Sequence, residues 1–151
     1  MLDSTRNGFV SLALSTFIAL SAVSYGAIAA DRTAAPATAK VYFIDLKDGA
    51  TVKSPLTLHF GLTGMGVAPA GIVFENTGHH HLFIDTPLPP DASLPIPAVD
   101  GKIVHFGKGQ TEATITLAPG KHTLQLQLAD AKHTAHDPVV ASDVITITVA
   151  P

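Results

Sequence analysis

The sequence contains no cysteine, and this absence removes several classes of protein at once. Without thiols the chain forms no disulfide, so an exported form must draw its stability from its core alone. A lipid anchor on cysteine and the thiolate ligands that suit soft metal ions are excluded as well. Any metal that this chain binds must therefore be held mainly by nitrogen and oxygen atoms.

Charged and aromatic residues are also scarce, at 14% and 6% of the chain, and the net charge is −3. No cluster of lysine and arginine is available to neutralise phosphates, which argues against nucleic-acid binding. The metal-hydrolase motif HExxH, the serine-nucleophile motif GxSxG and the phosphate-loop motif GxxxxGK[ST] are all missing. We therefore expect a binding or structural protein and not an enzyme.

The N-terminal 30 residues have the pattern of a signal peptide. Residues 9–23 are apolar, the length of a signal-peptide core and short for a membrane span. The small-x-small sequence AIA at 27–29 predicts cleavage after Ala29 or Ala30. We expect a periplasmic protein with no membrane span after cleavage. The alternative is an uncleaved membrane anchor, because Arg6 is the only basic residue of this segment.

Residues 31–39 are rich in alanine, threonine and proline and are predicted to be a disordered leader. Residues 40–151 are long enough for one domain with its own core. They show short alternating segments separated by glycine, proline and aspartate, and no helical periodicity. This pattern predicts a single immunoglobulin-like antiparallel β-sandwich of about seven strands. The expected strands are 41–46, 55–62, 79–85, 103–106, 111–117, 122–128 and 143–149.

One of these strands carries a more specific pattern. The sequence PGKHTLQLQLAD resembles the penultimate strand of bacterial immunoglobulin-like domains, in which a tyrosine after the turn makes the tyrosine-corner hydrogen bond. His122 occupies the place of that tyrosine. We therefore predict a structural role for His122.

Histidine is the residue that this chain has in excess, with eight copies. Imidazole is the commonest metal-binding side chain of proteins. His79, His80 and His81 are consecutive and begin a predicted strand, which places His79 and His81 on one face, about 7 Å apart at Cα, and His80 on the core face. His79 and His81 can therefore reach one metal ion. Alternatively, the imidazoles hydrogen-bond loop carbonyls and shape the strand edge.

A second group of histidines lies in the predicted loop 129–141. His133 and His136 are followed by Asp137, and in an immunoglobulin-like sandwich this loop neighbours the start of the His79 strand. We therefore predict a metal site formed by His79, His81, His133 and His136, with His105 as a further candidate. Imidazole ligands without thiolate favour Cu(II) or Zn(II). Met65 either adds a soft ligand or packs onto the core.

Several segments together resemble a known family. VYFIDLKDGATVKSP, FGLTGMGVAPAG, ENTGHHHLFID, HFGKGQTE and GKHTLQLQLAD are similar, in this order, to a family of small exported bacterial proteins called Domain of Unknown Function 4399. The resemblance implies no activity. In this family the histidine loop tends to read H-x-x-H-x-P-P, which His133, His136 and Pro138 fit, while Val139 replaces the second proline.

The sequence thus favours a periplasmic, non-enzymatic protein that binds copper or zinc through histidines, with no organic cofactor. The alternative is a structural or interaction module of the cell envelope in which the histidines are hydrogen-bonded structural groups. Such a module would bind an envelope protein or a glycan through residues 64–71 and the proline-rich segment 87–97.

Overall fold

The structure is a computed structural model that describes residues 32–151. The predicted signal peptide and its cleavage site lie outside the described residues. Within residues 32–151, no helix is long and apolar enough to cross a membrane.

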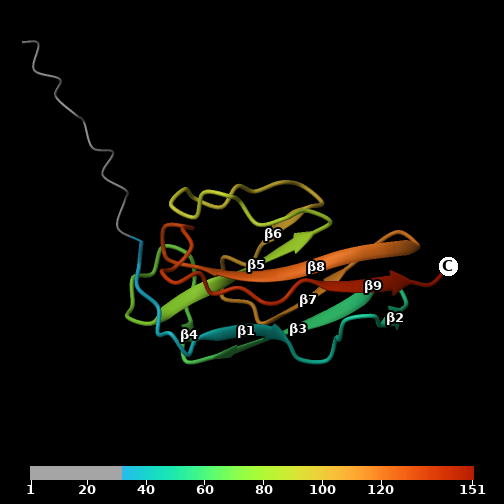
Figure 1. Cartoon of the computed structure of the whole chain (residues 1–151), viewed down its shortest axis with the longest axis horizontal. Coiled ribbons are helices and arrows are strands. Elements are labelled where there is room, and N and C mark those ends of the chain that lie inside the picture. Colours follow the sequence, from blue (N-terminus) through green and yellow to red (C-terminus); the bar gives the residue numbers. More distant parts are fainter. Residues whose placement is uncertain (1–31) are drawn as a thin grey trace, which may run out of the picture.

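The described chain forms two β-sheets that face each other (Figure 1). The smaller sheet is antiparallel, with the order β1-β3-β7. The larger sheet has the order β2-β9-β8-β5-β4, and β6 pairs with β5 beside β4. The strands are β1 (Lys40–Phe43), β2 (Thr51–Val52), β3 (Leu56–Thr63), β4 (Gly66–Val67), β5 (Thr77–Ile84), β6 (Ile103–His105), β7 (Glu112–Ile115), β8 (Gly120–Ala129) and β9 (Ile145–Val149). The predicted all-β sandwich is confirmed.

Two details differ from the prediction. The described chain has nine strands where about seven were expected, because β2 and β4 contain two residues each and are too short to show alternation in the sequence. Both are parallel to their partners, β2 to β9 and β4 to β5, so the larger sheet is mixed and not purely antiparallel.

The main core lies between the two sheets and follows the alternation of the strands. In β8, Leu124, Leu126 and Leu128 are fully buried, and in β5 Leu82 faces the same interior. The remaining members of this core come from β1, β3, β5 and β9, together with Phe106 and Val140, which lie outside the strands.

The outer face of β5 is also covered, which is unusual for an antiparallel sandwich strand. The long connection between β5 and β6 folds back over this face, at the top of Figure 1. Phe83, Ile96, Ile103 and Ala129 form a second, smaller apolar cluster beneath it. Side chains on the outer face of β5 are therefore buried although they point away from the main core.

The segment before β1 differs from the predicted disordered leader. Ala34 forms a parallel bridge with Asp137, and the Thr33 hydroxyl donates a 2.6 Å hydrogen bond to Asp130. Backbone hydrogen bonds link Ala35 N–H to the Asp137 carbonyl and Asp137 N–H to the Thr33 carbonyl. These bonds fix the segment against the loop between β8 and β9, a partner that composition alone does not reveal.

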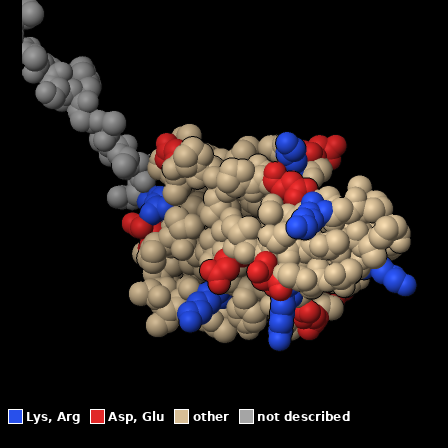
Figure 2. All heavy atoms as spheres, turned by 45° about the vertical axis from the view of Figure 1, so that its right-hand side comes forward, with Lys and Arg blue, Asp and Glu red and all other residues tan. Residues whose placement is uncertain are grey.

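Charged side chains are sparse on the face shown in Figure 2, and those of opposite sign lie side by side. On that face they form no extended area of a single sign. Its electrostatic field therefore has little power to attract a polyanion.

Candidate metal centre

The three consecutive histidines of β5 are divided between the two faces of the strand, as the alternation predicts. His80 points into the main core, where its ring lies 5.2 Å from that of Phe60 and its Nδ1 lies 3.2 Å from the Gln110 carbonyl oxygen. His79 and His81 point to the covered outer face, with ring centroids 4.9 Å apart. All three side chains are buried.

His105 joins the outer pair from the neighbouring strand. It lies directly opposite His81 in the β5–β6 pairing, and the two rings stack with centroids 5.0 Å apart. One ring nitrogen from each of His79, His81 and His105 lies within 4.8 Å of the other two. Residue 107 leaves room for this arrangement, because a Cβ on Gly107 would lie 2.3 Å from the His105 ring.

His133 completes a group of four imidazoles from the loop between β8 and β9. Its Nε2 is 3.1 Å from Nε2 of His105, and its ring centroid is 5.0 Å from that of His79. The backbone of His133 is left-handed, with φ of 66°, a conformation that costs energy for a residue with a side chain and is concentrated at functional sites. We call His79, His81, His105 and His133 the histidine cluster.

Asp130 holds the His133 loop in this conformation. Its Oδ1 accepts hydrogen bonds from the backbone N–H groups of Lys132 and Thr134, and its Oδ2 accepts a hydrogen bond from the Thr33 hydroxyl. Desolvation raises the pKa of this buried carboxyl, but these hydrogen bonds outweigh it and leave the pKa below its ordinary value. Asp130 is therefore an ionised anchor for the loop.

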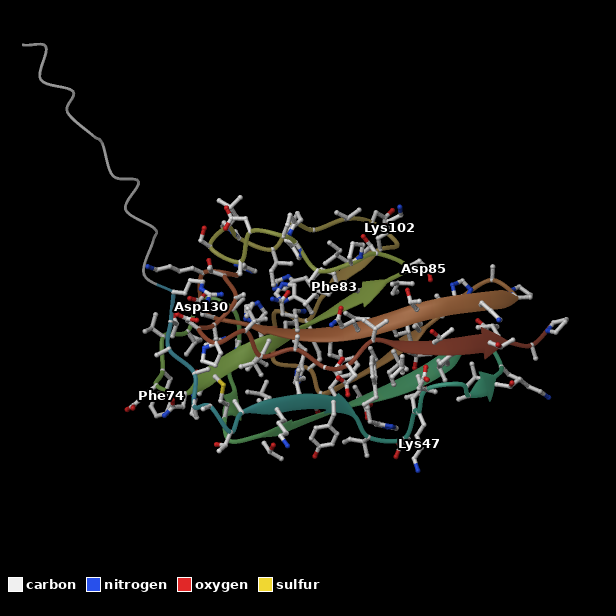
Figure 3. The ribbon with its side chains drawn as sticks, viewed as in Figure 1. Lys47, Phe74, Phe83, Asp85, Lys102 and Asp130 are labelled. Carbon is white, nitrogen blue, oxygen red and sulfur yellow. The ribbon has the colours of Figure 1, made fainter. Side chains whose placement is uncertain are left out.

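The histidine cluster runs from the interior to the surface. His79 and His81 are buried, His133 is half-buried and His105 is exposed. Figure 3 shows nitrogen-bearing side chains gathered between Phe83 and Asp130, above β5. One side of the cluster is thus closed by the sheet and the other side is open to solvent.

The buried ring nitrogens of the cluster lack hydrogen-bond partners. Both ring nitrogens of His79 and Nδ1 of His81 are buried and unpaired. Buried polar atoms are nearly always paired, and each exception calls for an explanation. A metal ion in contact with these rings would supply one, since a neutral imidazole nitrogen is a metal ligand as well as a hydrogen-bond acceptor.

The environment keeps the inner imidazoles uncharged. Burial, and then the neighbouring His105 and His133, lower the pKa of His79 to about 4. Burial, followed by His79, His105 and His133, lowers the pKa of His81 to about 3. Burial and His133 also lower the pKa of His105. Metal binding requires neutral imidazole, so these ligands need not lose protons at neutral pH.

The spacing of the cluster suits a four-coordinate metal ion. At a metal–nitrogen distance of 2.0–2.1 Å, ligand nitrogens in a tetrahedron lie about 3.3 Å apart. The Nε2 atoms of His105 and His133 are already 3.1 Å apart. The ligand nitrogens of His79, His81 and His105 lie within 4.8 Å of one another, so their separations would need to close by up to about 1.5 Å.

His136, the fourth predicted ligand, lies apart from the cluster. Its side chain is buried on the inner side of β5, with Nε2 3.2 Å from the Thr77 carbonyl oxygen and its ring against Gly78. It is three residues from His133 in a partly extended segment, and an odd spacing places two side chains on opposite sides. His105, the further candidate, lies in the cluster in the position that was expected for His136.

The other histidines are held by hydrogen bonds. Nε2 of His122 is 2.9 Å from the Ala118 carbonyl oxygen and its Nδ1 is 2.7 Å from Asp85, which raises the pKa of His122. This is the structural role predicted for His122. Met65 packs against the main core, the second of the two roles considered for it.

Three residues that shape the site escaped prediction, namely Gly107, Gln127 and Asp130. Gln127 faces the cluster from β8, directly opposite His81. Its sequence context, a polar residue alternating with leucines, resembles that of any solvent-facing position. Asp130 gave a usable signal, since aspartate often caps the turn that follows a strand.

Comparison with known proteins identifies the family. No curated protein and no solved structure matches the chain. A family model described as "Domain of unknown function (DUF4399)" matches residues 58–150, which include all four members of the histidine cluster. Because this match spans more than half of the 151 residues, the chain belongs to the DUF4399 family.

Proposed function

We propose that this protein binds one transition-metal ion, copper or zinc, through the histidine cluster, and that it does so as an exported, non-enzymatic binding protein. The observation that carries the proposal is the convergence of His79, His81 and His105, whose nitrogens lie within 4.8 Å of one another. Unpaired buried nitrogens on His79 and His81 support it. His133 is the fourth ligand.

The ligand set favours particular metals. Imidazole nitrogen suits Cu(II) and Zn(II), and among divalent first-row ions Cu(II) binds most tightly to a given nitrogen site. Neither thiolate nor thioether belongs to the cluster, so Cu(I) is disfavoured. The exposed side of the site, at His105, gives the ion a way in and out.

Isothermal titration of the purified protein, carrying no polyhistidine tag, with Cu(II) and Zn(II) tests the proposal. We expect one ion per chain at submicromolar affinity, lost in the double variant His79→Ala/His81→Ala. His59→Ala is the matched control, because His59 is a half-exposed histidine on β3 that pairs with Asp45 instead of joining the cluster. Binding that survives the double variant, or is lost in the control, contradicts the proposed site.

A second candidate function is an interaction module, and one observation favours it. Ile72, Val73 and Phe74 lie next to one another between β4 and β5 and are 54%, 86% and 72% exposed. Consecutive exposed apolar residues often mark a contact surface for another molecule. If the histidines are only structural, the double variant should lower the unfolding free energy through the lost packing of two buried rings, and wild type should bind no metal.

A further inference from the structure

Gln127 is a second side chain with an unexplained buried atom beside the histidine cluster. The residue is only 3% exposed, and its side-chain oxygen Oε1 is buried without a hydrogen-bond partner. Among residues 32–151 it is the one buried side-chain oxygen left unpaired. A buried amide oxygen without a partner costs about 1–3 kcal/mol, so its retention at this place calls for a reason.

The position of Gln127 relates this oxygen to His81. The two residues are directly opposite each other in the β5–β8 pairing, so their side chains share the outer face of the sheet. Opposed Cβ atoms in antiparallel strands are about 4.5–5.5 Å apart, a gap that a glutamine side chain spans. His81 has an unpaired buried atom of its own, Nδ1. An unpaired acceptor and an unpaired ring nitrogen therefore face the same small space.

Metal binding gives these two atoms complementary roles. An imidazole that binds a metal through one nitrogen carries its proton on the other, and that N–H requires an acceptor. If Nε2 of His81 binds the ion, Nδ1–H becomes a donor at a buried position. Gln127 supplies an acceptor without adding a charge.

We propose that Gln127 is a positioning residue of the metal site, accepting a hydrogen bond from Nδ1–H of His81 and thereby presenting Nε2 of that ring to the ion. This inference rests on the proposed function. Such supporting partners fix the tautomer and the orientation of a ligand, and their loss typically weakens metal binding about 10–100-fold.

The chain offers a matched set of variants. Gln127→Leu removes the acceptor at nearly constant size, and Gln127→Glu restores an acceptor. Gln125→Leu is the control: Gln125 lies two residues away on the same face of β8, but its amide donates to the Ser142 carbonyl oxygen. We expect Zn(II) affinity to fall about 10–100-fold in Gln127→Leu, to recover in Gln127→Glu and to stay within threefold of wild type in Gln125→Leu.

Nuclear magnetic resonance of the zinc-loaded wild type reads the protonation state of the His81 ring, on which the proposed hydrogen bond depends. Long-range proton–nitrogen correlations should show His81 protonated on Nδ1 and metal-bound through Nε2. This measurement needs no variant, so it stands even if Gln127→Leu fails to fold. Wild-type zinc binding with Gln127→Leu unaffected, or with His81 protonated on Nε2, overturns the role of Gln127 alone. A wild type that binds neither Zn(II) nor Cu(II) overturns the metal proposal and this inference together.

Discussion

At the scale of single residues, the ring of His105 occupies a space that exists because residue 107 has no side chain. A Cβ on Gly107 would lie 2.3 Å from Cε1 and 2.5 Å from Nε2 of His105. Gly107 does not have a positive φ, so alanine is compatible with its backbone. The strain of Gly107→Ala therefore falls on the imidazole.

We expect Gly107→Ala to weaken Cu(II) and Zn(II) binding by at least about tenfold while the protein stays folded, because displacing a ligand should cost no less than losing a ligand's supporting partner. Calorimetric titration and thermal unfolding measure the two quantities separately. Gly66→Ala is the control, because a Cβ there meets Thr77 at an ordinary 3.4 Å. An unchanged affinity in Gly107→Ala would show that His105 is not a ligand.

The lowered pKa values of His79 and His81 predict that the folded protein loses stability in acid. The pKa is about 4 for His79 and about 3 for His81, both below the ordinary value of 6.5. At pH values between the lowered pKa values and 6.5, these two histidines bind protons in the unfolded chain but not in the folded protein. Folded stability is therefore present above pH 6.5 and lost as the pH falls toward 4. Without metal, we expect the unfolding free energy to drop by on the order of 2 kcal/mol per histidine between pH 7 and 5.

Urea unfolding in the presence of a chelator, at pH 7 and at pH 5, measures this change. The double variant His79→Asn/His81→Asn should lose the part of the pH dependence that these two rings contribute, while His80 and His105, whose pKa values burial also lowers, keep theirs. His122 has a raised pKa because of its hydrogen bond to Asp85, so it stabilises the fold below its ordinary pKa and loses this effect as the pH rises through the raised value. His122→Gln should accordingly make the loss in acid larger. A pH-independent wild type would contradict the burial of neutral histidines.

At the scale of elements, the cluster combines a rigid half with an adjustable half. His79 and His81 lie on β5, which is hydrogen-bonded to β8 on one side and to β4 and β6 on the other. His133 lies on a loop whose shape depends on the hydrogen bonds of Asp130. Changes in the loop should thus affect the site without dismantling the sheet.

We expect Asp130→Ala to lower the unfolding free energy by about 2–3 kcal/mol, since it leaves the N–H groups of Lys132 and Thr134 without their acceptor. It should also weaken metal binding, because His133 loses its support. Asp91→Ala is the control, a carboxylate that organises an exposed turn with Ser93. Equal effects of the two variants would argue against a special role for the Asp130 loop. Chemical denaturation and metal titration provide the measurements.

The sequence predicted the elements that have a regular pattern. Alternating leucines identified β8, and alternation also assigned His80 to the core and His79 and His81 to the opposite face. The short parallel strands β2 and β4 have no pattern to detect. The choice between His105 and His136 depended on strand pairing and on the left-handed turn at His133, which are tertiary features.

At the scale of the whole molecule, metal binding should stabilise the fold as a unit. A ligand that binds only the folded state at 100 times its dissociation constant adds about 2.7 kcal/mol to the unfolding free energy. For a domain of this size we expect a rise in melting temperature of roughly 10 °C. Calorimetric melting with and without Zn(II) measures it, and the double variant His79→Ala/His81→Ala should show no rise. A wild type that melts at the same temperature in both conditions would contradict specific binding.

The strict alternation of β5 also determines what happens if this strand pairs in the wrong register. A shift of one residue in the pairing of β5 would carry His79 and His81 into the main core and turn Leu82 outward. That arrangement places imidazoles between the two sheets and removes Leu82 from the leucine layer, so it is not a stable alternative. The register that completes the hydrophobic core is thus also the register that places the proposed metal ligands of β5. A molecule that has completed its core has, by the same pairing, already placed the inner pair of histidines.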